Sequence, residues 1–454
     1  MELLGGSVLN SAIKFGFWDT EPIRNLCVFS SVTQTQKNVR LRLEVSFKLS
    51  FVDMRHSTGP ERRPNKLRGS AFSLAAHKIT KAFLLRGEDM INLKTMVAST
   101  AVLALMASSA MAADKVLRIQ SVLSTSADEV VMLREFGKDV AALTSGSLTI
   151  EVLPAGAVVG PRDVMDAVDA GLVEGGFAWT HYWGGKHIAA NLFGAPIAGA
   201  GVGLDNIAFL SWFQYGGGKE LYDRLWDEMG VNVKGFMLQP VGPEALGWFP
   251  KPIKSMDDFR KLRFRAPPGM VGAAYAEIGV PAVAMGGGDI LPALEKGTID
   301  AAEWCCPKPD SVFGFQKVLK HYYLQGLHQV VVNADMYVNG DFYNSLSTVE
   351  QKALEVAANA SLSKSLSYRI YENGKALKDL TDNHGVILED TPADYFTEYM
   401  AAAKKSLQAA ADENEFFAEV WQSQKDFADP VVPFWSGAQT SNASLGRAHA
   451  VTLK

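Results

Sequence analysis

Polar side chains end two of the strands expected in the second half of this chain. Arg265 lies near the end of a strand expected at 262–266, and Glu303 and Trp304 close another, expected at 298–304. A guanidinium binds a carboxylate through two parallel N–H···O bonds, and a carboxylate is a ligand for hard cations. Each residue taken alone also fits a solvated strand end. The pattern is therefore compatible both with a site for a small anion or a cation and with solvated strand ends.

Aromatic residues follow a third strand, expected at 174–179. The segment 181–186 reads His-Tyr-Trp-Gly-Gly-Lys. The rings of Tyr182 and Trp183 at a strand end could wall a small-ligand pocket, and they fit core packing equally well.

Two adjacent cysteines, Cys305 and Cys306, come directly after Trp304. A thiolate beside a histidine would be a nucleophile, which leaves a hydrolase or transferase as an alternative. The Cα atoms of neighbouring residues are held ~3.8 Å apart, closer than in most disulfides, so we expect the pair to be unbridged, as two small semi-apolar side chains beside the cleft. With Cys27 as the third cysteine, the chain has no disulfide framework and no Cys-rich zinc module.

No catalytic signature is convincing. The glycine run at 286–288 precedes a helix but lacks the Lys-Ser/Thr of a phosphate-binding loop. The histidines show no metal-ligand spacing, so each is expected to be a surface or hydrogen-bonded histidine rather than a ligand.

Strand and helix patterns alternate from residue 115 onward. Strands are expected at 116–122, 148–153 and 174–179, with helices at 128–143 and 162–172 between them. A second such set follows residue 242, with strands at 262–266, 281–285 and 298–304 and helices at 270–278 and 289–296. This order predicts an α/β protein with two lobes, mainly parallel strands and a ligand cleft between the lobes.

The C-terminal part is expected to be helical. Ser347 and Glu350 form a capping-box pattern before a long helix that ends near Gly385. Thr391-Pro392 begins a second helix, with Pro392 as its first residue, that runs towards Lys425. The segment 436–454, rich in small polar residues, is expected to be a loose tail.

Charge divides the chain unevenly. Residues 1–89 hold 14 basic and 8 acidic residues, a net of +6, whereas the remainder holds 30 and 41, a net of −11. Residues 90–112 have the parts of a secretory signal peptide: a Met, Lys94, an apolar run at 97–106 and an Ala-x-Ala site ending at Ala112. We therefore expect 1–89 to be an over-extended start and the mature protein to be periplasmic, and the acidic balance gives no sign of nucleic-acid binding.

Five stretches between residues 115 and 434 resemble the extracytoplasmic solute receptors of TRAP transporters (the DctP type), in the subgroup that binds 2-oxo and 2-hydroxy monocarboxylates. They are 182–186, 216–222, 242–249, 262–265 and 293–304. The resemblance implies a two-lobed periplasmic binding protein fold with long C-terminal helices, and a receptor rather than an enzyme. It also implies delivery of a small carboxylate to the membrane permease subunits.

The resemblance also implies site residues. Arg265 matches the arginine that anchors the substrate carboxylate, and Glu303 and the Trp304 carbonyl match ligands of a bridging cation. Gln329 and Tyr182, with Trp183 beside it, are implied as pocket residues.

Glu244 stands where such receptors usually carry Gln. A second carboxylate favours Ca²⁺ over Na⁺ as the bound cation, because Ca²⁺ takes more oxygen ligands and more negative charge. Alternatively, Glu244 is protonated or is the counter-ion of an amine-bearing ligand.

The expected lobes are 113–241 with 331–372, and 242–330 with 373–435. The C-terminal helices either brace the lobes or swap between subunits, which leaves a homodimer open.

Overall fold

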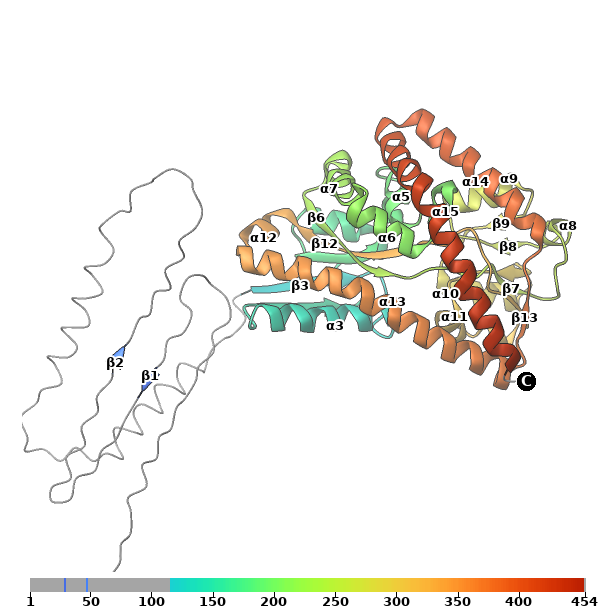
Figure 1. Cartoon of the computed structure of the whole chain (residues 1–454), viewed down its shortest axis with the longest axis horizontal. Coiled ribbons are helices and arrows are strands. Elements are labelled where there is room, and N and C mark those ends of the chain that lie inside the picture. Colours follow the sequence, from blue (N-terminus) through green and yellow to red (C-terminus); the bar gives the residue numbers. More distant parts are fainter. Residues whose placement is uncertain (1–27, 30–45, 48–114, 453–454) are drawn as a thin grey trace, which may run out of the picture. The chain divides into compact units, whose positions relative to one another are not determined.

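The computed structural model describes residues 28–29, 46–47 and 115–452 (Figure 1). The chain forms two compact units, Met1–Thr95 and Met96–Lys454. In the first unit, β1 (Val28–Phe29) pairs antiparallel with β2 (Ser46–Phe47). The predicted signal peptide at 90–112 lies outside the described residues.

The first sheet of the second unit has five strands in the order β4-β3-β5-β12-β6. Their bounds are β3 Lys115–Ser121, β4 Leu148–Leu153, β5 Gly175–Trp179, β6 Val233–Pro240 and β12 Asn333–Asn339. β3 is parallel to β4 and β5, as the alternating pattern predicts. β12 enters from much later in the chain and is antiparallel to both β5 and β6, so the sheet is mixed.

Short helices and turns pack around this sheet. They are α3 Asp128–Leu143, η1 Pro161–Asp163, α4 Val164–Asp169, η2 Thr180–Trp183, α5 Ala190–Gly194, η3 Gly199–Gly203, α6 Asn206–Tyr215, α7 Gly218–Met229 and α12 Gly340–Ser345. α4 lies so close to β5 that a Cβ at Gly176 would be 2.6 Å from Cγ1 of Val164. The glycine in this buried strand is therefore required by packing.

The second sheet has six short strands in the order β13-β11-β7-β10-β8-β9. Their bounds are β7 Gly247–Phe249, β8 Phe264–Arg265, β9 Ala282–Val283, β10 Ala301–Ala302, β11 His321–Tyr323 and β13 Ile387–Glu389. The helices of this part are α8 Met256–Phe259, α9 Met270–Glu277, α10 Gly287–Glu295, α11 Pro307–Phe313 and η4 Phe315–Lys317. Buried aromatic rings fill its core, including a stacked pair formed by Trp248 and Tyr322.

Two segments connect the sheets and run beside each other. Residues 241–246 lead from β6 to β7, and residues 324–332 lead from β11 to β12. The Val241 N–H donates to the Val332 carbonyl at 2.7 Å, and the Glu244 N–H donates to the Gln329 carbonyl at 3.0 Å. We call this pair the crossing segments.

A single long helix, α13 (Thr348–His384), packs on both parts. It contacts β6 and α3 at the first sheet and α11 near the second (Figure 1). Ser347 and Glu350 form the predicted capping box, and Gly385 ends the helix in a left-handed conformation (φ 63°).

Two further helices complete the chain and correct the sequence prediction. α14 spans Ala393–Glu413, and a new helix, α15, spans Glu415–Thr452. The break falls at Asn414, whose side-chain oxygen accepts the Phe417 N–H at 2.7 Å and so caps the start of α15. The prediction of one continuous helix from Pro392 to Lys425 is therefore wrong. The loose tail at 436–454 is also wrong as far as Thr452, because α15 continues through Pro430 and Pro433.

The predicted α/β class with long C-terminal helices is confirmed, and the second unit has two sheets, each with parallel and antiparallel pairs. The lobe boundaries and the cleft between the lobes stay predictions. Among the described residues, none of the helices has the length and apolar character needed to cross a membrane.

Candidate functional site

Four neighbouring strands of the second sheet bring polar residues to one edge. β8 and β10 are parallel, so Arg265 at the end of β8 and Glu303 directly after β10 leave the sheet at the same side. β7 is antiparallel to β10, and β11 is antiparallel to β7. The start of β7, preceded by Glu244, and the end of β11, followed by His328, therefore reach that same edge.

Arg265 and Glu303 form a buried ion pair there. Nη1 of Arg265 donates both to the Glu303 carboxylate and, at 3.0 Å, to the Glu303 carbonyl. Its Nε and Nη2 donate to the Met285 carbonyl at 3.3 and 3.1 Å. The side chains are 6% and 0% exposed. The guanidinium fork is thus held on the protein itself, with one Nη2 hydrogen left over.

A second carboxylate and an imidazole complete a three-residue cluster, which we call the acidic cluster: Glu244, Glu303 and His328. One possible ligand atom from each lies within 4.8 Å of the others, and all three residues are buried. Nε2 of His328 is 3.7 Å from Oε2 of each carboxylate, too far for a hydrogen bond. Both Oε2 atoms and both ring nitrogens are buried without a hydrogen-bond partner.

Charge and burial oppose each other in the acidic cluster. Burial, together with the charge of Glu303, raises the pKa of Glu244 to about 7, although His328 and Arg265 act against this. Burial favours the neutral imidazole, but the two carboxylates outweigh it and raise the pKa of His328 to about 9. His328 is therefore an internal counter-charge to the two carboxylates.

His328 is the site residue that sequence reasoning missed. The sequence predicts its neighbour Gln329 as a pocket residue and every histidine as a surface or hydrogen-bonded one, but both ring nitrogens of His328 are buried without a hydrogen-bond partner. Only the fold brings His328 to the edge where Glu244 and Glu303 lie.

Trp304 covers Arg265. The Arg265 guanidinium carbon lies 5.3 Å from the centre of a Trp304 ring, within cation–π range. A Cβ at Gly287, the first residue of α10, would be 2.7 Å from Cη2 of that indole. The glycine run at 286–288 is therefore a tight helix start that leaves room for Trp304.

The other predicted pocket residues lie in different surroundings. Tyr182 is 46% exposed, yet enough protein surrounds its phenol that burial raises its pKa to about 12. The charges of Arg265 and Glu244 act on the same group, so Tyr182 is within electrostatic reach of the site. Trp183 is buried, and its ring contacts Tyr337 edge-on. Gln329 is buried, and its carbonyl holds the Glu244 N–H.

The expectation of unbridged cysteines is wrong. Cys305 and Cys306 form a disulfide, with Cα atoms 3.8 Å apart. The spacing of neighbouring Cα atoms is the same in any chain, so whether their sulfurs meet depends on the intervening backbone, which the sequence does not show. Neither sulfur is a free thiol in this state, so the Cys-dependent hydrolase or transferase lacks its nucleophile.

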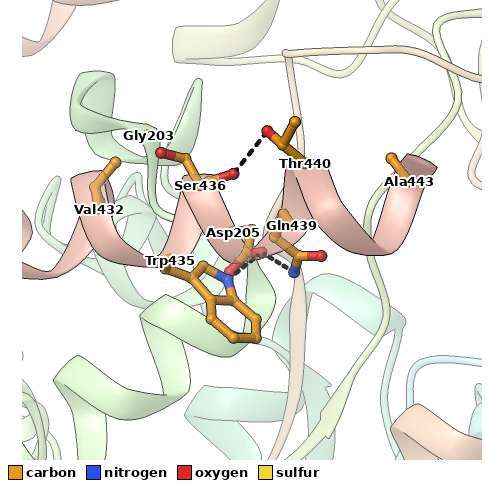
Figure 2. A pocket seen from close by; sticks show the side chains of 8 residues that line it. All are labelled: Gly203, Asp205, Val432, Trp435, Ser436, Gln439, Thr440 and Ala443. Carbon is orange, nitrogen blue, oxygen red and sulfur yellow. Dashed lines mark hydrogen bonds between the residues drawn. The ribbon is translucent and has the colours of Figure 1, made fainter. Parts of the chain in front are cut away.

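A groove of about 340 Å³ lies elsewhere, between α15 and the turn before α6 (Figure 2). It is lined by Gly203, Asp205, Val432, Trp435, Ser436, Gln439, Thr440 and Ala443. Its carboxylate, Asp205, already accepts hydrogen bonds from Trp435 and Gln439 at 2.7 and 3.2 Å. None of the predicted site residues lines it, so we assign no ligand to this groove.

Comparison with known proteins identifies the family of this chain. Residues 120–414 match the family model for bacterial extracellular solute-binding proteins, family 7 (DctP). The chain is 31% identical over 294 residues to a monocarboxylate 2-oxoacid-binding periplasmic protein of Nostoc sp. (strain PCC 7120). That match covers 64% of this chain and 78% of the relative.

Solved structures of solute-binding proteins are also similar to this chain. A TRAP transporter solute-binding protein from Bordetella bronchiseptica, a dimer with calcium and picolinate, matches with a TM-score of 0.68 and 27% identity. The match covers 75% of this chain and 99% of that one. A TRAP periplasmic solute-binding protein from Pseudoalteromonas atlantica, with sodium and pyruvate, matches with a TM-score of 0.66 and 26% identity, over 72% and 98% of the two chains. A third, from Colwellia psychrerythraea, holds calcium and pyruvate and matches with a TM-score of 0.66 and 26% identity, over 73% and 99%.

The family match covers most of the described chain, and these structural relatives share its fold. The chain belongs to family 7 of the bacterial extracellular solute-binding proteins.

Proposed function

We propose that this protein is the solute receptor of a TRAP transporter and binds a small 2-oxo or 2-hydroxy monocarboxylate together with one cation. The observation that carries the proposal is the buried edge where Arg265 lies beside the acidic cluster. Relatives with 26–27% identity hold sodium or calcium with pyruvate, or calcium with picolinate. The receptor would release its ligand to the membrane permease, without chemical change.

The residues present fit a hard cation. Two buried carboxylate oxygens, Oε2 of Glu244 and of Glu303, have no hydrogen-bond partner. With the carbonyl of Trp304, which the family resemblance implies as a further ligand, they would give an all-oxygen donor set, which is what Na⁺ and Ca²⁺ prefer. Glu244, Glu303 and Trp304 would hold the ion, which would supply positive charge shared between protein and ligand oxygens.

Each polar residue then has a separate task. Arg265 exchanges part of its bonding to Glu303 and Met285 for a charge-assisted bond to the ligand carboxylate. An oxygen on the carbon next to that carboxylate lets the ligand reach the cation through two oxygens, which favours 2-oxo and 2-hydroxy acids. In the metal-free protein His328 balances the charge of the two carboxylates. A bound cation would take over that role, so His328 would be neutral in the liganded receptor. Tyr182 is the aromatic contact contributed from beside the first sheet.

The test is calorimetric titration of purified, chelator-treated protein with pyruvate and lactate, with Na⁺ or Ca²⁺ added back. We expect binding only when a cation is present. Acetate, which lacks the second oxygen, is the matched control and should bind more weakly. Tight binding of an amino acid, or equal binding of pyruvate without any metal, would contradict the proposal.

We also propose that residues 90–112 direct export to the periplasm, which the family description supports. The apolar run and the Ala-x-Ala site predict a mature protein beginning at Ala113. N-terminal sequencing of the exported protein tests this, and a mature chain that retains residues before Met90 would contradict it.

A homodimer through the C-terminal helices is part of the proposal. α15 exposes Phe434 and Leu445, each 73% accessible, and the relative from Bordetella bronchiseptica is a dimer. Light scattering after gel filtration should give twice the mass of one mature chain, and a monomer at all concentrations would exclude the dimer.

A further inference from the structure

The Cys305–Cys306 disulfide directly follows Glu303 and Trp304, two of the three residues that we propose as cation ligands. Both cysteines are buried, with exposures of 5% and 3%. The pair is therefore part of the protein interior, next in sequence to the proposed site.

The backbone of the pair connects three parts of the site. The Cys305 carbonyl accepts the Ala245 N–H at 2.7 Å, which ties it to the residue after Glu244. Cys306 is the N-cap residue of α11, and its carbonyl accepts the Asp310 N–H at 3.0 Å. The loop that carries Glu303 and Trp304, the loop that carries Glu244, and α11 thus meet at this disulfide.

The buried carboxylate of Asp310 links the cysteine pair to the second sheet through hydrogen bonds. Its Oδ1 accepts the Cys305 N–H at 3.0 Å, and its Oδ2 accepts bonds from the Trp248 indole at 2.9 Å and the Tyr322 hydroxyl at 3.0 Å. Trp248 and Tyr322 belong to β7 and β11, so the disulfide loop is bonded to the middle of the sheet.

We propose that this disulfide positions the Trp304 carbonyl and, through the bond between the Cys305 carbonyl and the Ala245 N–H, Glu244. The receptor then binds its ligand tightly in the oxidised state and weakly after reduction. This inference rests on the proposed function. The physical reason is that the disulfide closes a small ring containing the peptide bond, which restricts the backbone dihedrals of both residues and holds the neighbouring ligand groups in place.

Reduction would release that restriction. One thiolate of dithiothreitol attacks one cysteine sulfur, which breaks the S–S bond, releases the other cysteine as a thiol and leaves a mixed disulfide with the reagent. The second thiol of the reagent then attacks its own sulfur in that mixed disulfide and releases the first cysteine. The protein gains two electrons and two protons as two thiols, and the reagent becomes a cyclic disulfide. The loop after Trp304 can then adopt other backbone conformations, and its carbonyl no longer has a single orientation.

The experiment compares one protein in two redox states. Purified full-length protein is titrated with pyruvate and Ca²⁺ before reduction with dithiothreitol, after it, and after reoxidation. Mass spectrometry of the peptide that carries both cysteines should show the untreated peptide lighter than the reduced one by two hydrogen atoms. We expect about 10- to 100-fold weaker binding after reduction, the range typical of losing support around a metal site, and recovery on reoxidation.

Cys305→Ser/Cys306→Ser is the matched variant, since serine keeps the size but cannot bridge. It should bind as weakly as reduced wild type and should not respond to dithiothreitol, which excludes an effect through Cys27. Thermal unfolding of each sample checks that the fold persists. Equal affinity in both redox states, or two free thiols in the untreated protein, would overturn the inference. If oxidised wild type binds no carboxylate at all, the proposed function fails instead.

Discussion

Arg265 shows how a single residue can be both buried and available. Its charge is neutralised by Glu303 and its fork is held by two backbone carbonyls, so the structure tolerates it without a ligand. A ligand carboxylate competes for bonds that already exist rather than for a free cation. Affinity therefore depends on the difference between two sets of charge-assisted bonds.

Replacing Arg265 by Ala should remove the carboxylate anchor and leave Glu303 without its partner. We expect a loss of binding free energy on the order of 2–5 kcal/mol, measured by calorimetry with pyruvate. Arg265→Lys should restore only part of it, because Lys keeps the charge but not the fork. Arg263→Ala is the matched control, since Arg263 is exposed and bonds to Asp300. Unchanged affinity in Arg265→Ala would reject the assignment.

Glu244→Gln should change which cation the site prefers. The amide keeps an oxygen ligand but removes one negative charge, so the preference should move from Ca²⁺ towards Na⁺. Pyruvate titrations of wild type and variant after chelation, with each ion added back, measure the change. The idea is wrong if the ratio of affinities in Ca²⁺ and Na⁺ is the same for both proteins.

Helix ends show how individual elements are attached to the sheets. Glu350 closes the capping box of α13 and reaches beyond it to Lys115 at the start of β3 and to Ser147 before β4. One side chain thus ties the start of the longest inter-sheet helix to the edge of the first sheet.

That attachment should depend on pH. Burial alone would raise the pKa of Glu350, but hydrogen bonds from Ser347, Lys115 and Ser147 lower it to about 2. A lowered pKa stabilises the folded state above pH ~4.5, and this is lost as the pH falls towards 2. The contribution is at most about 3 kcal/mol, from 1.36 kcal/mol per pKa unit.

Denaturant unfolding of wild type and Glu350→Gln at pH 7 and pH 3 measures the effect. The variant should be less stable at pH 7, and the difference should shrink at pH 3. Glu355→Gln is the control, because that partly exposed glutamate pairs only with the neighbouring Lys352. A difference that does not change with pH would show that shape, not charge, matters at this position.

The sequence predicted individual elements better than their assembly. α3 was predicted with its observed bounds because Leu133, Phe136 and Val140 repeat on one buried face. The order β11-β7-β10-β8 involves residues far apart in the chain, and no local pattern specifies it. Arg265, Glu303 and Glu244 were brought together by family resemblance. His328 was missed because its neighbours in space, unlike its neighbours in sequence, are acidic.

At the scale of the whole second unit, the site and the connection between the sheets are the same piece of chain. Glu244 and His328 belong to the crossing segments, which are hydrogen-bonded to each other. With lobes at 113–241 plus 331–372 and at 242–330 plus 373–435, as we propose, ligand binding acts directly on the hinge.

Small-angle X-ray scattering should therefore detect closure. We expect the radius of gyration to fall when pyruvate and Ca²⁺ are added together, because the ligand draws Tyr182 towards Arg265. Arg265→Ala should show no such change at the same concentrations. A wild-type radius that does not change while calorimetry shows saturation would mean that the lobes are already closed without ligand.

α13 has a practical consequence for sensor design. A helix of 37 residues that contacts the first sheet at β6 and α11 beside the second sheet acts as a rigid rod, so two dyes at its ends would report a nearly constant separation. The same dyes placed on exposed residues away from it, such as Tyr215 and Val312, would report lobe movement. A fluorescent reporter built on this receptor thus carries its own internal reference, provided that no label or insertion touches the crossing segments.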